Sequence, residues 1–177
     1  VSSAFGPRVA PKPGASTYHR GTDFSHTFSD IRAVADGQIK VVGYKGGWSG
    51  GGNMVWVQHE GFFTRSLHMV STSVVNDQFV RAGDKLGVMG KTGTATDTHL
   101  HFELTPGRLH SLNSGQVDPV PFLTTLINTG TPGTGAGSAE DMGMTAEEWR
   151  QFQVLAATTN AMSARVANID AWISAGG

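Results

Sequence analysis

The chain has 177 residues, and its 13 basic and 14 acidic side chains leave a net charge of −1. This balance lacks the basic footprint of a nucleic-acid-binding protein, and no apolar run approaches the roughly 20 residues of a membrane-spanning helix. We therefore expect neither a nucleic-acid partner nor insertion into a membrane. The sequence contains no cysteine, so a metal would have to be held by His, Asp or Glu.

Glycine is abundant, with 24 residues, and only 15% of the side chains are charged. Many tight turns and few long charged helices favour a mainly β body. The length suits one domain with a small appendage. No signal peptide is recognisable at the start of the chain, which begins at Val1.

Residues 1–14, which include Pro11, Pro13 and Gly14, indicate a strand remnant followed by a rigid loop, and residues 18–24 indicate a short strand or loop. His19 and Asp23 lie four residues apart in this last segment, a spacing that places them on one side of an extended strand or of a helix turn. Gly21 between them favours a loop or strand. Taken alone, the segment also fits a surface loop that carries a histidine and an aspartate by chance.

The stretch from 31 to 68 alternates strands and turns. A hairpin is predicted from strands over 31–35 and 38–42 around Asp36-Gly37, and two further strands over 54–59 and 62–68. The glycine-rich segment 46–53 lacks the Lys-Ser/Thr ending of a phosphate-binding loop and precedes no helical pattern, which excludes nucleotide binding there. His68 closes the last strand, where a half-buried structural histidine would be ordinary.

The stretch 80–90 predicts a single twisted strand, and the polar loop 91–97 leads into a strand over 98–104. Alternate side chains of a strand share a face, so His99, His101 and Glu103 are expected on one side. Two imidazoles beside a carboxylate suit a divalent transition metal, although an ordinary polar strand face explains the pattern equally well. Residues 118–123 predict a closing turn and a short helix.

The last segment differs in composition from the rest. Residues 129–144 are rich in Gly, Thr and Pro and indicate a flexible linker. Thr145 and Glu148 form a capping box at the start of a helix predicted over 145–175, whose apolar residues follow a heptad spacing. Such a helix is marginal alone in water, so it packs on the domain, self-associates with copies of itself or binds a missing partner.

Five residues along the chain have the chemistry of a catalytic metal site: His19, Asp23, His68, His99 and His101. A catalytic zinc ion has three protein ligands of N and O type and an open position for water, whose pKa falls to about 7. Histidines that are not ligands can orient that water, move its proton or stabilise an oxyanion. No H-E-x-x-H helix is present, which excludes the arrangement with a glutamate base.

Three motifs, in order, resemble those of the lysostaphin-like (LytM-type) zinc metalloendopeptidases: His19-x-Gly21-x-Asp23, Ser66-Leu67-His68-Met69 and His99-Leu100-His101-Phe102-Glu103. The pattern Ser3-x-Phe5-Gly6-x-Arg8 agrees as well, and the resemblance covers residues 1–123. It implies a two-layer antiparallel β-sheet metallopeptidase domain over 1–128 with a long groove. Before His68 an aromatic and a small residue are usual in this family, and a leucine after it, so Ser66-Leu67 and Met69 indicate a change in packing.

The resemblance also implies the roles of the residues. His19, Asp23 and His101 would bind one Zn²⁺ per chain, while His68 and His99 would flank the metal-bound water and the scissile carbonyl. Cobalt or manganese would suit the same donors. The substrate would be a peptide in the stem or cross-bridge of bacterial peptidoglycan, cut at the cell wall.

Other readings remain open. A catalytically silent wall-binding or hydrolase-activating module, or a virion structural protein assembled through the helix, would share these features. The appended helix and the missing signal peptide suit a phage endolysin or virion-associated bacteriolytic enzyme. Glu103 either steadies a ligand histidine or is an ordinary strand residue. Structural or exposed positions are expected for His26, His59 and His110, and groove-lining positions for Tyr18, Trp48 and Asn53.

Overall fold

The computed structural model describes residues 1–13, 15–25, 30–44, 49–107 and 114–129, and this part of the chain is mainly β. Its elements, in order, are β1 (Gly6–Pro7), β2 (Tyr18–His19), β3 (Thr22–Phe24), β4 (Asp30–Arg32), β5 (Gly37–Tyr44), the 3₁₀ turn η1 (Ser49–Gly51), β6 (Asn53–Gln58), β7 (Phe62–Met69), β8 (Ser71–Thr72), β9 (Phe79–Val80), β10 (Lys85–Val88), β11 (Leu100–Pro106) and α1 (Pro119–Thr129).

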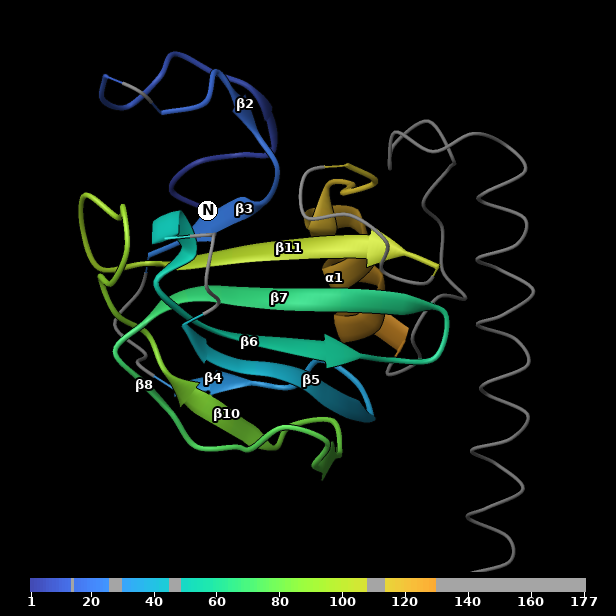
Figure 1. Cartoon of the computed structure of the whole chain (residues 1–177). Coiled ribbons are helices and arrows are strands. Elements are labelled where there is room, and N and C mark those ends of the chain that lie inside the picture. The colour runs from blue at the N-terminus through green and yellow to red at the C-terminus, as the bar shows by residue number, and fades with distance from the viewer. Residues whose placement is uncertain (14, 26–29, 45–48, 108–113, 130–177) are drawn as a thin grey trace, which may run out of the picture.

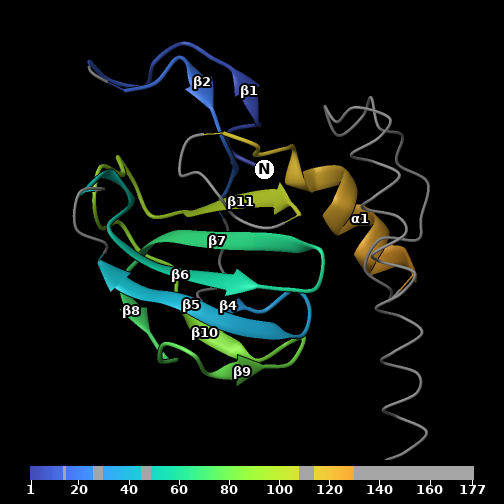
Figure 2. The ribbon, with the colours of Figure 1, turned by 45° about the vertical axis from the view of Figure 1, so that its right-hand side comes forward.

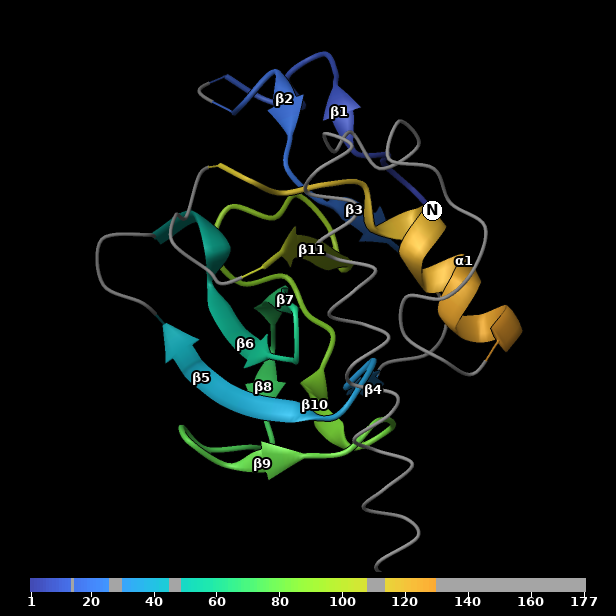
Figure 3. The same cartoon turned by 90° about the vertical axis from the view of Figure 1, so that its right-hand side faces the viewer.

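The strands form two packed layers and a small ribbon. The large sheet has the strand order β3-β11-β7-β6-β5-β9, and all its neighbouring pairs are antiparallel. The second layer, β4-β10-β8, packs against one face of the large sheet; Figure 1 shows β10 below β5, and Figure 3 shows β8 and β10 on the inner side of the curve formed by β6 and β5. Figure 2 shows the ribbon of β1 and β2 above β11, on the side of the large sheet that ends with β3. This architecture confirms the predicted mainly β, antiparallel fold class.

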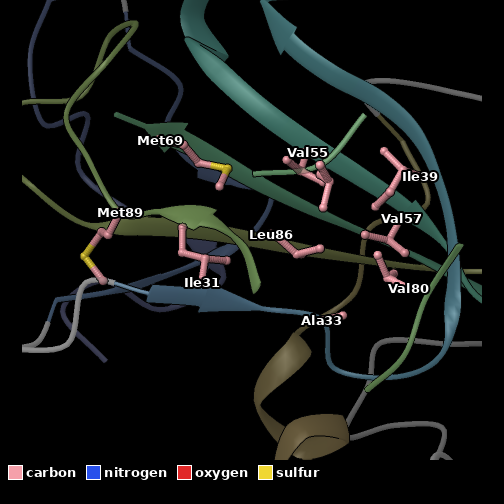
Figure 4. Packing of buried hydrophobic residues seen from close by; sticks show 10 residues of the cluster. Ile31, Ala33, Ile39, Val55, Val57, Met69, Val80, Leu86 and Met89 are labelled. Carbon is pink, nitrogen blue, oxygen red and sulfur yellow. The ribbon is translucent and has the colours of Figure 1, made fainter. Parts of the chain in front are cut away.

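The core between the two layers depends on the alternation of side chains along each strand. On β6, Val55 and Val57 point into this core, whereas Met54 and Trp56 belong to a cluster on the opposite face. Figure 4 shows Val55 and Val57 gathered around Leu86 of β10. Burying each such side chain contributes about 1.5–3 kcal/mol. This burial therefore fixes which face of the large sheet turns away from the second layer.

A smaller apolar cluster attaches α1 to the large sheet. Phe122 of α1 is 1% exposed and packs with Phe62 of β7 and Leu104 of β11. The rings of Phe62 and Phe122 lie 4.9 Å apart. The closing helix predicted over 118–123 is thus confirmed, and it extends further, to Thr129.

The hairpin predicted around Asp36-Gly37 is wrong. β4 pairs with β10 in the second layer, while β5 pairs with β6 and β9 in the large sheet. The reason is the core, which Ile31 of β4 and Ile39 of β5 enter from opposite layers. Asp36 stabilises the crossing between the layers, because its Oδ1 accepts a hydrogen bond from the backbone N–H of Ala82.

The single strand predicted over 80–90 is also wrong. β9 ends at Val80 and β10 begins at Lys85, and the two strands lie in different sheets. A turn separates them, in which Asp84 Oδ2 accepts a hydrogen bond from the backbone N–H of Arg81 and Gly83 adopts a φ of +87°. The positive φ suits glycine, which has no Cβ to clash.

The other predicted strands are confirmed. Those over 54–59, 62–68 and 98–104 correspond to β6, β7 and β11. The predicted linker beyond Thr129 and the helix over 145–175 lie outside the described residues and stay predictions. Among the described residues, no helix has the length and apolar character needed to cross a membrane.

Candidate metal centre

Strand register brings the second histidine of the H-x-H motif to an aspartate far from it in sequence. His101 of β11 lies directly opposite Asp23 of β3, so both side chains project from the same face. β2 brings His19 to the same point, and the chain then passes close to β11 at Gly21 before it enters β3. A Cβ at Gly21 would lie 2.5 Å from Phe102 O and 2.8 Å from His101 Nε2, which explains why glycine stands between the two residues.

Three atoms converge at this point. His19 Nε2 lies 3.1 Å from Asp23 Oδ1 and 3.0 Å from His101 Nδ1. Asp23 Oδ1 and His101 Nδ1 are 2.8 Å apart. Neighbouring donors around a tetrahedral zinc ion, with bonds of about 2.0–2.1 Å, lie about 3.4 Å apart. The triangle is therefore slightly smaller than a zinc site requires. Of the described residues, these three form the group suited to hold a metal ion.

The outer hydrogen bonds of the two histidines fit a cation between them. His19 Nδ1 lies 2.8 Å from the carbonyl oxygen of Ala4, and His101 Nε2 lies 3.2 Å from Glu103 Oε1. A neutral ring carries one proton, and these acceptors place it on the outer nitrogen. The inner nitrogens then offer lone pairs beside the Asp23 carboxylate. Three electron donors this close together require a proton or a metal ion, so the donor set fits zinc.

The charges of the site affect the pKa values of its members. Burial raises the pKa of Asp23, but hydrogen bonds from His101 and His19 outweigh this effect and hold it well below its usual range. Burial likewise lowers the pKa of His101, yet hydrogen bonds to Asp23 and Glu103 raise it to about 9. Without a metal ion, a proton on His101 therefore occupies the centre at neutral pH.

Two more histidines stand beside this centre. The ring of His68 lies 5.0 Å from that of His99 and 5.8 Å from that of His101. Each has its Nδ1 fixed by a backbone carbonyl, that of Thr92 at 2.9 Å for His68 and that of Asp97 at 2.8 Å for His99. With Nδ1 on a carbonyl, Nε2 is the ring nitrogen left for other contacts in both residues, and His99 Nε2 lies 3.6 Å from Asp23 Oδ1.

His68 has an unusual backbone conformation and a lowered pKa. Its φ is +64°, a conformation that costs a non-glycine residue about 1–3 kcal/mol and is common at functional sites. Burial, together with the charges of His101 and His99, lowers its pKa to about 4. His68 is therefore a neutral ring at neutral pH, able to accept a proton from a polar partner.

A cleft of about 470 Å³ opens over the centre. One wall is the N-terminal segment, and the other is the loop that precedes β11; the lining includes Ser3, Arg8, Lys12, Asp23, His68, Thr94, Asp97, His99 and His101. Lys12 Nζ donates a hydrogen bond to the carbonyl oxygen of Thr94 at 2.6 Å and so joins the walls. Arg8 Nη1 lies 3.6 Å from Asp23 Oδ2.

The structure brings together all five residues that the sequence nominated for metal chemistry, and places His59 elsewhere. His59 is 5% exposed, and its ring nitrogens contact Asp36 O and Thr64 Oγ1, both at 2.9 Å. Neither Tyr18 nor Asn53 is among the described residues lining the cleft, contrary to expectation. Tyr18 packs edge-on against Phe5. His26, Trp48 and His110 lie outside the described residues.

Sequence reasoning gave no role to Arg8 and Lys12, although both line the cleft. Arg8 had one signal, its place in the Ser3-x-Phe5-Gly6-x-Arg8 pattern. Lys12 had none, because its contact with Thr94 joins segments 82 positions apart.

The proton on His101 predicts a pH dependence of metal binding. A metal ion has to displace this proton at any pH below the pKa of about 9. We expect the apparent affinity for zinc to rise with pH, about tenfold per pH unit through this proton, and to level off near that pKa. Competition with a chelator at about pH 6, 7 and 8 measures it. An affinity that stays constant over this range would contradict the assignment of His101 Nδ1 as a donor.

Comparison with known proteins gives the family. The sequence model of peptidase family M23 matches residues 17–119. An uncharacterized metalloprotease of Haemophilus influenzae is 34% identical over 157 residues, which cover 87% of this chain and 29% of that protein. The peptidoglycan DD-endopeptidase ShyC of Vibrio cholerae is 34% identical over 113 residues, which cover 62% and 25%. The chain thus spans less than a third of the length of these curated relatives.

A solved structure agrees with this result. The catalytic domain of the antimicrobial peptidase lysostaphin from Staphylococcus simulans superposes with a TM-score of 0.60 at 29% identity, over 68% of this chain and 89% of that domain. The family match takes in β2, β3, β7 and β11, which carry His19, Asp23, His68 and His101. The family model matches more than half of the residues of this chain, so the chain belongs to peptidase family M23.

Proposed function

We propose that this domain is a zinc-dependent endopeptidase that hydrolyses peptide bonds in the stem or cross-bridge of bacterial peptidoglycan. The observation that carries the proposal is the triangle of His19 Nε2, Asp23 Oδ1 and His101 Nδ1, with sides of 2.8–3.1 Å. Two of its members, Asp23 and His101, line an open cleft. Membership of a peptidase family supports it, as do the names of ShyC, a peptidoglycan DD-endopeptidase, and lysostaphin, an antimicrobial peptidase.

In this proposal His19, Asp23 and His101 hold one zinc ion per chain. When bound, zinc supplies a Lewis acid that polarises the scissile carbonyl and makes a water molecule a nucleophile near neutral pH. Asp23 and the inner nitrogens of the two histidines are donors that the fold holds in place before the ion arrives. The hydrogen bond from His19 Nδ1 to Ala4 O and that from His101 Nε2 to Glu103 keep both rings from turning.

His68 and His99 are the proposed catalytic histidines. Each is anchored through Nδ1 to a backbone carbonyl, so that Nε2 is an acceptor at a fixed position. Such an acceptor orients the attacking water and takes its proton as the carbonyl is attacked. The low pKa of His68, about 4, keeps its ring neutral and ready for this role over the neutral range.

The test is turbidity loss of a purified peptidoglycan suspension, measured alongside zinc content. We expect one zinc per chain, loss of hydrolysis on treatment with a chelator, and recovery when zinc is restored. Zinc bound without hydrolysis of walls from several bacterial classes would favour the silent binding module. Hydrolysis that survives complete removal of the metal would contradict the zinc mechanism.

A further inference from the structure

A row of buried polar and aromatic side chains crosses the large sheet next to the metal centre. Glu103 of β11 lies opposite Arg65 of β7, and Arg65 lies opposite Trp56 of β6. Directly opposed residues on antiparallel strands project from the same face. Glu103, Arg65 and Trp56 are 2%, 1% and 3% exposed, so this row is shielded from water.

Close contacts connect the side chains of this row to one another and to His101, a proposed metal ligand. Arg65 Nη1 donates to Glu103 Oε2 at 2.6 Å, and the guanidinium carbon lies 4.8 Å from the centroid of the Trp56 ring. The second oxygen of the carboxylate, Oε1, accepts a hydrogen bond from His101 Nε2 at 3.2 Å. Glu103 therefore divides its two oxygens between Arg65 and His101.

Stability alone is a weak reason for such a pair. Removing two charges from water costs several kcal/mol per ion, and apolar side chains of the same volume often serve as well or better. A buried carboxylate with one oxygen on a cation and the other on an imidazole has a more specific effect. It decides which ring nitrogen carries the proton and how the ring is turned.

We infer that Glu103, held in place by Arg65, is a positioning residue that fixes the tautomer and ring orientation of His101, so that Nδ1 presents its lone pair to the metal ion. The inference rests on the proposed function, because it takes the cluster of His19, Asp23 and His101 to be the metal centre. Arg65 contributes by holding the carboxylate in one rotamer, and Trp56 by giving the guanidinium a flat surface to stack on.

Glu103→Gln tests this role with little change in shape. The amide can turn its NH₂ group toward His101 Nε2 and so favour the opposite tautomer, with the proton on Nδ1. We expect the dissociation constant for zinc to rise about 10–100-fold, the range found when outer partners of metal ligands are removed. The absorption spectrum of the cobalt-loaded protein, which reports ligand geometry, should change as well.

Two further variants separate positioning from folding. Arg65→Gln combined with Glu103→Gln leaves no unpaired buried charge, so it avoids the main cause of misfolding in the single variant. It should show the same loss of zinc affinity. Thr64→Val is the matched control. Thr64 lies on β7, next to Arg65, and the substitution removes its buried hydrogen bond to His59. Thr64 is not among the described residues that line the cleft. The zinc affinity of this variant should equal that of the parent chain.

The outcomes are distinct. If the double variant folds and binds zinc as tightly as the parent chain and Thr64→Val, with an unchanged cobalt spectrum, the row is structural and the inference is overturned. If the parent chain itself binds no zinc, the proposed function fails, and the role given to Glu103 fails with it. Weaker binding in the double variant but unchanged binding in Thr64→Val supports the inference.

Discussion

His101→Ala should remove both the bound zinc and the hydrolysis of peptidoglycan. The substitution deletes one of three proposed donors and leaves Asp23 and Glu103 without the group that lies between them. A Lewis acid contributes several kcal/mol of transition-state stabilisation. Its loss should lower the rate of hydrolysis by at least about 1000-fold. Zinc content of the purified variant and turbidity loss of a wall suspension measure the two effects.

His59→Ala is the matched control for this experiment. His59 is also a buried histidine with two hydrogen bonds, but it lies outside the cleft. We expect its removal to lower the thermal midpoint while one zinc stays bound and hydrolysis continues. A His101→Ala protein that keeps its zinc and its activity would refute the ligand assignment. Equal losses in both variants would instead point to unfolding as the cause.

The candidate metal centre could be predicted from the sequence because its residues lie in short motifs. The two-residue period of a strand placed His101 and Glu103 on one face, and the hydrogen bond between them agrees with this. The pairing of His101 with Asp23 was a different matter. It depends on the register of strands 78 positions apart, which no local spacing reveals, and it entered through the family resemblance.

The two wrong strand predictions have one physical cause. Asp36-Gly37 is a strong local signal for a hairpin, yet β4 and β5 lie in different layers because their apolar side chains are buried in the core between those layers. Likewise the run from Val80 to Gly90 has the composition of one strand but supplies two sheets. Turn residues indicate where the chain changes direction, whereas the burial of Ile31 and Ile39 decides which strand it meets next.

The hydrogen bonds that hold the site histidines in place could not be predicted from the sequence, for another reason. The anchors of His19, His68 and His99 are backbone carbonyls of Ala4, Thr92 and Asp97. Every residue has a carbonyl group, so such contacts leave no signature in the side-chain pattern. Arg65 was equally inconspicuous, because a single arginine inside a strand is ordinary until its partner across the sheet is known.

Replacing the two proposed catalytic histidines should separate the chemistry from metal binding. We expect His68→Asn and His99→Ala to keep one zinc per chain while kcat falls about 10²–10⁴-fold, the usual contribution of a positioned acid or base. Asparagine is chosen at position 68 because it tolerates the φ of +64° better than alanine does. Losses that do not add in the double variant would indicate that both rings act on the same step.

The position of His99 makes this experiment decisive for the ligand set. Its Nε2 lies 3.6 Å from Asp23 Oδ1, farther than the 2.8 Å of His101 Nδ1, but near enough to compete for an ion. If His99→Ala loses zinc while His101→Ala retains it, the assignment is reversed: His99 is the metal ligand and His101 is the catalytic histidine. If each variant gives the expected result, the closer ring is the ligand. The farther ring, anchored on the carbonyl of Asp97, then shares the transfer of the proton with His68.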